Sequence, residues 1–198
     1  MQDYERVNPT DVSPMKLFAS LIMLVMLLAP MAQTQATVPT ASTDFPVPGH
    51  GSLRLKLPDG WRSRALPLTD PASVTLHFTP AHGDAFDVQV TSVWLDSAKR
   101  ADVTLDSIKA GTQHAAEGLL PHSVEKTVSL HELRGPQSIG FYYALTDREP
   151  GPGEFSNLTQ GIFLTGDILS TFTILHRTSV PPEVAHALQA FAEATYVK

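Results

Sequence analysis

Four residues have the types and spacing to bind a metal ion: His77, His82, Asp84 and Asp87. Imidazole nitrogens and carboxylate oxygens are ligands that zinc and similar ions accept. If the chain reverses direction between His77 and Asp87, the four side chains could meet around one turn. Their spacing matches no established metal motif, however, and a solvated strand face carries the same residue types. A metal site and a plain polar surface are therefore alternative interpretations.

The other residues that could carry chemistry predict no catalytic centre. A hydrolase triad needs a nucleophile, a base and an acid that orient one another, and no Gly-x-Ser-x-Gly turn presents a serine in that way. The glycines do not follow the phosphate-binding or dinucleotide-binding patterns either. Five further histidines are scattered over predicted helices and strand ends: His114, His122, His131, His176 and His186. The sequence therefore predicts a protein that is not an enzyme and has no cofactor.

Aromatic residues offer a second kind of site. Phe141, Tyr142 and Tyr143 are consecutive, and neighbouring residues of a strand point to opposite faces of a sheet. If one face is open to solvent, Tyr142 is a candidate contact for a partner or a small ligand. Trp61, which follows a turn sequence, is the other candidate contact. Most large aromatic side chains serve instead as core anchors, because they bury much apolar area.

A β-hairpin must position the histidine and aspartate group. Leu76 and Phe78 alternate with polar residues, and the same alternation resumes after a turn at Phe86. Period-two alternation indicates a strand with one buried face. The last three predicted strands should form a meander, because Gly166-Asp167 is a hairpin turn. The alternation predicts strands at residues 52–57, 74–79, 86–94, 124–130, 139–145, 158–164 and 168–175.

Two helices interrupt the strands. Between residues 102 and 119, apolar residues recur at intervals of three and four, the pattern of a helix with one buried stripe. Asp102 or Thr104 can cap this helix at its N-terminus. A closing helix follows Ser179, with prolines in its first turn. Antiparallel strands with segregated helices predict an α+β fold, in which an antiparallel sheet of about six to seven strands is sandwiched between helices.

The N-terminal part predicts export from the cytoplasm. Residues 17–28 form an uncharged apolar run directly after Lys16. The run is long enough for a signal peptide but too short to span a membrane. We expect residues 1–36 to be a signal peptide, with translation starting at Met15 and cleavage near Ala36, where small residues precede the site.

The domain organisation follows from this leader. If translation starts at Met1, where the flank is acidic, the apolar run would instead act as an uncleaved membrane anchor. Residues 37–51 are rich in proline, threonine and serine, which predicts a flexible tether. Residues 52–198 then form a single α+β domain, since a chain of that length can bury a sizeable core.

Composition narrows the expected partners. The chain has no cysteine, which excludes disulfides, lipid attachment through cysteine and thiolate metal sites. Its formal net charge is −6, and the predicted mature chain keeps 17 acidic and 12 basic residues. An acidic surface repels phosphate groups, so neither nucleic acid nor anionic lipid is an expected partner. We expect a periplasmic or extracellular protein whose partner is another envelope protein, and which meets the membrane only if its leader stays uncleaved.

The segment Leu-Arg-Leu-Lys-Leu-Pro-Asp-Gly-Trp at residues 53–61 resembles the opening of the PsbP-like and DcrB-like families, where a strand runs into a Pro-x-Gly-Trp turn. The segments at residues 140–143, 161–164 and 171–175 are similar to later strands of these families, and the likeness extends over residues 49–197. The resemblance implies an antiparallel sheet between helices, used in these families as a docking or assembly module and not as a catalyst. It implies no functional residue, because the matching positions are structural.

Two functions are therefore expected as alternatives. The first is an exported, non-catalytic protein that binds another protein. The second is an envelope protein that binds a small ligand or a metal ion, with weak enzymatic activity, and it is motivated by the histidines and the aromatic strand. A ligand that prefers the native state raises its melting temperature, so a thermal-shift screen separates the two.

Overall fold

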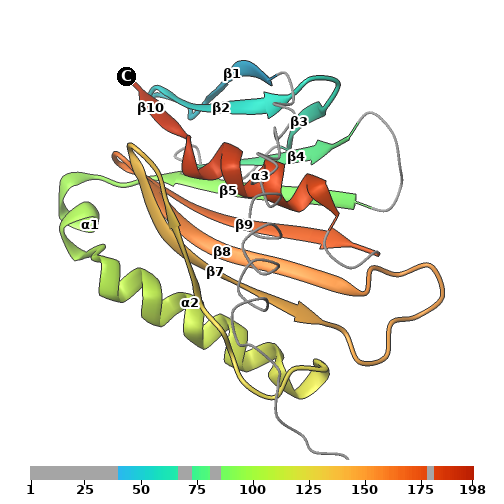
Figure 1. The fold of residues 1–198 in the computed structure, drawn as a ribbon. Coiled ribbons are helices and arrows are strands. Elements are labelled where there is room, and N and C mark those ends of the chain that lie inside the picture. Colours follow the sequence, from blue (N-terminus) through green and yellow to red (C-terminus); the bar gives the residue numbers. More distant parts are fainter. Residues whose placement is uncertain (1–39, 67–72, 81–85, 178–180) are drawn as a thin grey trace, which may run out of the picture. The chain divides into compact units, whose positions relative to one another are not determined.

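Two antiparallel sheets form the framework of the molecule (Figure 1). The computed structural model describes residues 40–66, 73–80, 86–177 and 181–198. The large sheet has the spatial order β3 (Arg62–Leu66), β4 (Ser73–Thr79), β5 (Phe86–Trp94), β9 (Ile168–His176), β8 (Asn157–Thr165), β7 (Ser138–Thr146) and β6 (His131–Arg134). The small sheet has the order β1 (Thr40–Pro46), β2 (Ser52–Pro58) and β10 (Thr195–Val197).

Helices cover the large sheet on both faces. The longest helix, α2 (Leu105–Leu119), packs against β7 and β8 on one face. On the other face lie α3 (Pro182–Ala192), which contacts β2, β6 and β7, and the small sheet. The short helix α1 (Ser97–Asp102) precedes α2, and a 3₁₀ turn (Leu120–His122) follows it. The predicted α+β class, with an antiparallel sheet of about six to seven strands between helices, is confirmed. The strand predicted at residues 52–57 belongs to the small sheet, which the pattern did not predict as a separate sheet.

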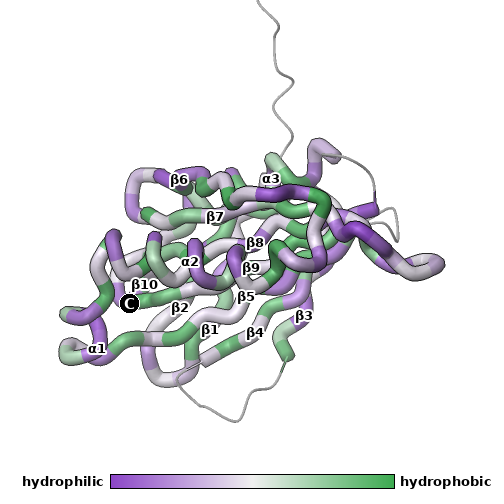
Figure 2. The backbone as a smooth tube through the Cα atoms, turned by 90° about the horizontal axis from the view of Figure 1, so that it is seen from below, coloured by the Kyte–Doolittle hydropathy of each residue, from purple (hydrophilic) through white to green (hydrophobic). Residues whose placement is uncertain are grey.

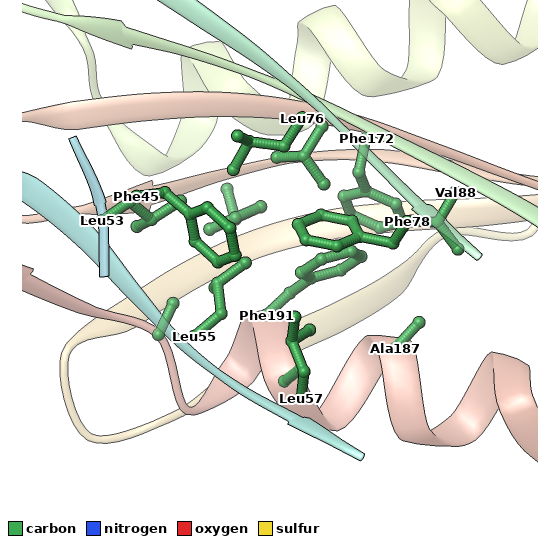
Figure 3. Packing of buried hydrophobic residues seen from close by; sticks show 14 of the residues in the cluster. Phe45, Leu53, Leu55, Leu57, Leu76, Phe78, Val88, Phe172, Ala187 and Phe191 are labelled. Carbon is green, nitrogen blue, oxygen red and sulfur yellow. The ribbon is translucent and has the colours of Figure 1, made fainter. Parts of the chain in front are cut away.

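The main core lies between the large sheet and the layer formed by α3 and the small sheet (Figure 3). Period-two alternation sends Phe78 of β4 and Phe172 of β9 to this side, and both are fully buried. Phe191 of α3 packs onto Phe172 with ring centroids 4.8 Å apart. The strands therefore depend on α3 and the small sheet to cover their apolar face.

Within the described ranges, helix α2 covers only part of the opposite face. Helix α2 buries Ile108, Thr112 and Ala116, a stripe at intervals of four residues. Its N-terminus is fixed by a capping box, in which the Ser107 N–H donates to Thr104 Oγ1 at 3.1 Å, and the Thr104 N–H donates to Ser107 Oγ at 2.9 Å. This confirms Thr104 as the cap. Because α2 packs on β7 and β8, the same face of β3, β4 and β5 can keep polar residues.

The predicted tether at residues 37–51 is corrected by the structure. Residues 40–46 form β1, and residues 47–51 form the turn into β2, with the Val47 N–H donating to Gly51 O at 2.8 Å. Phe45 and Val47 are buried in the main core, and these two anchors account for the strand. The proline, threonine and serine content of the segment concealed the pattern.

The strand predicted at residues 124–130 is also wrong. This segment is a loop, and the next strand is the shorter β6. Val124 is 53% exposed, while Val128 and Leu130 pack against the small cluster around Tyr143. Apolar residues at alternating positions here serve as separate anchors of a loop and not as one face of a strand.

The leader prediction falls outside the described residues. The signal peptide, its cleavage near Ala36 and the choice between Met1 and Met15 therefore stay predictions. No helix within the described ranges is long and apolar enough to cross a membrane. The predicted cap Ser179 also lies outside the description, and α3 begins directly after Pro181.

Candidate functional site

An accessible polar area occupies the part of the large sheet beyond α2. The register places Arg64, His77, Gln89 and Thr173 in one row across four strands, and directly opposed residues point to the same face. We call this area the polar face and define it by Arg62, Arg64, Thr75, His77, Asp87, Gln89, Thr91, Thr171 and Thr173. It extends over β3, β4, β5 and β9.

His77 and Asp87 form an ion pair on this face. His77 Nε2 lies 2.5 Å from Asp87 Oδ1, and the two side chains are only 22% and 23% exposed. The hairpin register explains the contact, because Asp87 lies two residues from Gln89, the direct partner of His77. Apart from this pair, Asp87 Oδ1 has no hydrogen-bond partner among the described residues. The acidic group of the polar face is therefore already engaged.

The structure tests half of the predicted metal group. It brings His77 and Asp87 together, whereas His82 and Asp84 lie outside the described residues. Within the described ranges, no group of three or more histidine, aspartate or glutamate residues is arranged to hold a metal ion. The metal site stays a prediction that rests on the four-residue pattern.

Hydroxyl and amide groups in the middle of the polar face bond to one another. Thr75 Oγ1 and Thr91 Oγ1 lie 2.9 Å apart, and Gln160 Nε2 donates to Thr173 Oγ1 at 3.1 Å. The Tyr143 hydroxyl donates to Gln160 Oε1, and burial raises the pKa of Tyr143 to about 12. These side chains satisfy each other and leave little hydrogen-bonding capacity for a ligand.

The two arginines of β3 differ from the others. Of the seven arginines in the described ranges, five donate a side-chain hydrogen bond to a carboxylate or a backbone carbonyl: Arg54, Arg100, Arg134, Arg148 and Arg177. Within those ranges, Arg62 and Arg64 have no such partner, and both are exposed. They lie two residues apart on the same face, so β3 presents two uncompensated positive charges.

Comparison with known proteins bears on the fold. No protein-family model matches the chain, and no curated protein sequence matches it. The solution structure of cyanobacterial PsbP (CyanoP) from Synechocystis sp. PCC 6803 matches with a TM-score of 0.50, over 82% of this chain and 95% of that one, at 10% sequence identity. The chain has a PsbP-like fold. The predicted PsbP-like resemblance is thus confirmed at the level of the fold.

In this PsbP-like fold, the Pro-Asp-Gly-Trp turn holds the start of β3. The Trp61 N–H donates to Pro58 O at 3.2 Å, and Gly60 has a φ of 83°, a left-handed value that favours glycine. Trp61 is partly buried and meets Phe86 edge to face, with ring centroids 5.5 Å apart. The turn motif therefore fixes the position at which β3 begins, and with it the position of Arg62.

The two predicted aromatic contacts do not form one site. Trp61 packs at the start of β3, whereas Tyr142 lies on β7 with its ring 5.2 Å from that of His131. Tyr142 is partly buried against the main core, on the side of the large sheet opposite the polar face. Their role as ligand contacts stays a prediction. Sequence reasoning passed over Arg62 and Arg64, although two arginines at alternate positions after the turn were a visible signal.

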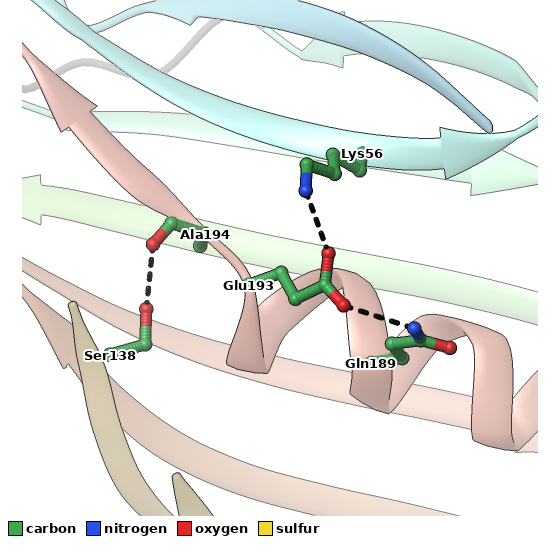
Figure 4. A network of polar contacts seen from close by, with 5 residues as sticks. All are labelled: Lys56, Ser138, Gln189, Glu193 and Ala194. Atoms are coloured by element: carbon green, nitrogen blue, oxygen red, sulfur yellow. Dashed lines mark hydrogen bonds and ion pairs between the residues drawn. The ribbon is translucent and has the colours of Figure 1, made fainter. Parts of the chain in front are cut away.

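A cleft of about 640 Å³ lies beside the C-terminal end of α3. Its basic side chains are neutralised: Lys56 Nζ lies 3.0 Å from Glu193 Oε2 (Figure 4), and Arg54 Nε lies 2.6 Å from Asp44 Oδ1. Hydrogen bonds from Gln189 and Lys56 lower the pKa of Glu193. Among the described residues, each basic side chain of this cleft is therefore paired with a carboxylate. In this respect the cleft differs from β3, whose arginines have no such partner.

A smaller pocket of about 210 Å³ adjoins the polar face. Its floor is apolar and includes Leu145, Leu158 and Leu175, while Phe155 and Asp147 are among its walls. Leu175 lies directly opposite Asp87 in the register, so the pocket borders the His77–Asp87 pair. The pocket is large enough for a small apolar group, since a cavity of roughly 150 Å³ can hold benzene.

Proposed function

We propose that this chain is an exported, non-catalytic protein that binds another protein through the β3 side of the polar face. The observation that carries the proposal is the pair of exposed arginines on β3, Arg62 and Arg64, for which the described chain supplies no counter-charge. Charged groups that a protein leaves uncompensated on its surface favour partners of opposite charge. The expected partner is therefore a protein with an acidic surface.

The charge of the whole molecule sharpens this argument. The chain has a formal net charge of −6, so most of its surface repels an acidic partner. A local positive area on an acidic protein orients such a partner toward one place. Asp87 does not neutralise Arg64. Asp87 lies on β5, which is separated from β3 by β4, and its carboxylate contacts His77 of β4.

Binding rather than catalysis is supported by the state of the polar face. Its only pair of acid and base groups among the described residues is His77 and Asp87. The nearby hydroxyls of Thr75 and Thr91 bond to each other. An activated nucleophile requires a hydrogen bond to its base, and no such bond joins a described hydroxyl to His77.

Export is supported by the apolar run at residues 17–28. Sequencing the N-terminus of the protein isolated from its native host tests this part of the proposal. We expect the mature chain to begin just after Ala36. A product that retains Met1 would refute cleavage and favour a membrane anchor.

Site-specific photo-crosslinking tests the binding surface. A photoreactive amino acid replaces Gln89, which is exposed on the polar face in the same row as Arg64, or Lys126, which is exposed on a loop. We expect position 89 to give one protein adduct that position 126 does not give. The adduct should disappear when Arg62→Glu and Arg64→Glu are added. Equal adducts from both positions, or an adduct indifferent to the charge reversal, would contradict the proposed surface.

A second candidate function is the binding of a small apolar ligand. The pocket over Leu145, Leu158 and Leu175 supports it, because an apolar floor with a few polar groups at the rim is typical of ligand sites. Thermal-shift screening with small aromatic and short-chain lipid compounds tests this function. A ligand whose stabilising effect is lost in Leu158→Trp, which fills the pocket, would favour it over protein binding.

A further inference from the structure

We infer that the partner binds by adding an extended acidic segment as a new strand along the outer edge of β3. This inference rests on the proposed function and states the chemistry and geometry of the partner. An edge strand offers the same hydrogen bonds to a new chain that it makes to its neighbour within the sheet. The argument has three parts: the backbone is free, the strand is accessible from both faces, and its charges select the occupant.

Only one edge of β3 forms backbone hydrogen bonds to a neighbouring strand of the described chain. β3 lies at the end of the strand order and pairs within the sheet with β4 alone, from Arg62 opposite Thr79 to Leu66 opposite Thr75. In an antiparallel pair, alternate residues direct their N–H and C=O groups to the neighbouring strand, and the residues between direct theirs outward. Among the described residues, no strand pairs with the outward groups of β3, which can therefore pair with another chain.

The strand is open on both faces. Arg62 and Arg64 are exposed on the polar face, and Ser63 and Ala65, which point to the opposite side, are exposed as well. The small sheet and α3 therefore do not cover this strand. In the hydropathy view, β3 begins with hydrophilic residues and ends with hydrophobic ones beside β4 (Figure 2). An incoming strand would meet no steric barrier from the described residues.

The arginines determine which sequence can pair here. Side chains on neighbouring strands lie directly opposite one another at about 4.5–5.5 Å between their Cβ atoms. Arg62 and Arg64 would thus face two side chains of the new strand that are also two residues apart. Aspartate or glutamate at alternate positions satisfies both guanidinium groups, which bind carboxylates in a forked geometry.

The same charges exclude a second copy of this chain. If two β3 strands paired edge to edge, arginine would face arginine on the polar face, and like charges at opposed positions are destabilising. Charged residues on an edge strand protect a protein from such self-association. On β3, the two arginines oppose pairing with a second copy of the chain but still allow an acidic strand to pair.

Peptide binding to the full chain tests the inference. The probe is a short fluorescent peptide in which aspartate alternates with valine. Two further probes have the same sequence but carry N-methyl groups on one or the other set of alternate backbone amides. We expect the parent to bind and one methylated form to bind at least tenfold more weakly, because it loses the hydrogen bonds to β3. A peptide with lysine in place of aspartate should not bind.

Protein variants provide the matched controls. Arg62→Glu with Arg64→Glu should reduce the affinity for the aspartate peptide at least tenfold and allow the lysine peptide to bind. Lys126→Glu, which changes the charge of an exposed loop residue, should leave both affinities unchanged. Circular dichroism spectra that match the wild type establish that the variants are folded.

The outcomes separate this inference from the proposed function. If both methylated peptides bind as tightly as the parent while the charge reversal still weakens binding, the partner uses side chains alone, and strand addition is wrong. If the charge reversal and Lys126→Glu behave alike, both the inference and the proposed surface are wrong. Failure of the aspartate peptide to bind at millimolar concentration would overturn strand addition, as would a dimer of the wild type that the charge reversal dissociates.

Discussion

The two edge strands of the large sheet differ in how their charged residues are paired. At β6, Leu133 is buried in the main core, and Arg134 donates to Glu132 at 2.7 Å, so the charges on this strand cancel. α3 contacts this strand, although three of its four residues are exposed. At β3, the first four residues are exposed and two arginines lack a partner among the described residues. The difference teaches that packing and an internal ion pair hold one edge strand in the fold, while the charges of the other remain available for recognition.

The packing of the β6 edge should give the largest effect on stability. Leu133→Ala removes a side chain that is 3% exposed and leaves a cavity under α3. Such truncations cost about 2–5 kcal/mol in the free energy of unfolding. Urea denaturation followed by circular dichroism measures it. A loss below about 0.5 kcal/mol would contradict the claim that packing of Leu133 holds this edge strand in the fold.

Tyr143, on the neighbouring strand β7, should make the stability of the fold depend on pH in the alkaline range. Burial raises the pKa of Tyr143 to about 12 from its usual value of 10.0, so between these values the unfolded chain loses a proton that the folded chain keeps. The free energy of unfolding should therefore fall as the pH rises from 10 toward 12. Thermal melts along this pH series should show a smaller fall for Tyr143→Phe than for the wild type.

Tyr142→Phe is the control for that experiment, because it alters the neighbouring tyrosine and leaves Tyr143 in place. It should keep the fall in stability above pH 10. Identical pH profiles for Tyr143→Phe and the wild type would show that the ionisation of Tyr143 does not contribute.

The charge pair on β6 should contribute little by itself. Arg134→Ala removes the partner of Glu132, but both side chains are largely exposed, and such pairs are worth about 0–1 kcal/mol. Denaturation at low and at high salt checks this prediction, since screening should reduce even that small loss. A loss above about 2 kcal/mol would mean that the pair, as well as Leu133, holds this edge strand in the fold.

The arginines of β3 should have the smallest effect on stability. Arg62→Ala with Arg64→Ala should change the free energy of unfolding by less than about 0.5 kcal/mol, because the described chain makes no hydrogen bond or ion pair to either side chain. Denaturation measures this, and the crosslink from position 89 should nevertheless be lost. Marked destabilisation would indicate that the arginines serve the fold, which would remove the contrast between the edges.

Much of the large sheet could be predicted from local pattern. β5 and β9 alternate between buried and less buried positions over most of their length, because one of their faces is buried. β4 and β8 alternate over part of their length and also contain consecutive buried residues. The meeting of His77 and Asp87 followed from the hairpin that joins β4 to β5. These features depend on residues close in the sequence, so periodicity and turn residues were sufficient.

Neither the edge strand β3 nor the C-terminal strand β10 could be predicted, because each is held by pairing with another strand and not by apolar alternation of its own. β3 has no apolar alternation, since four of its five residues are exposed, and it exists because it pairs with β4. β10 is a three-residue strand that forms against β2, where Thr195 lies opposite Arg54. That Arg62 and Arg64 lack a counter-charge depends on where Asp87 lies in the folded sheet, which no local pattern contains.

Hydrogen exchange of the backbone amides in β3 tests the central claim most directly. In the free protein, the amides of β3 that point outward should exchange rapidly, whereas buried strands such as β9 should be protected. Addition of the aspartate peptide should protect the outward amides of β3 and leave those of β6 unchanged. Protection of all β3 amides in the free protein, or no change when the peptide binds, would contradict an open edge that receives a strand.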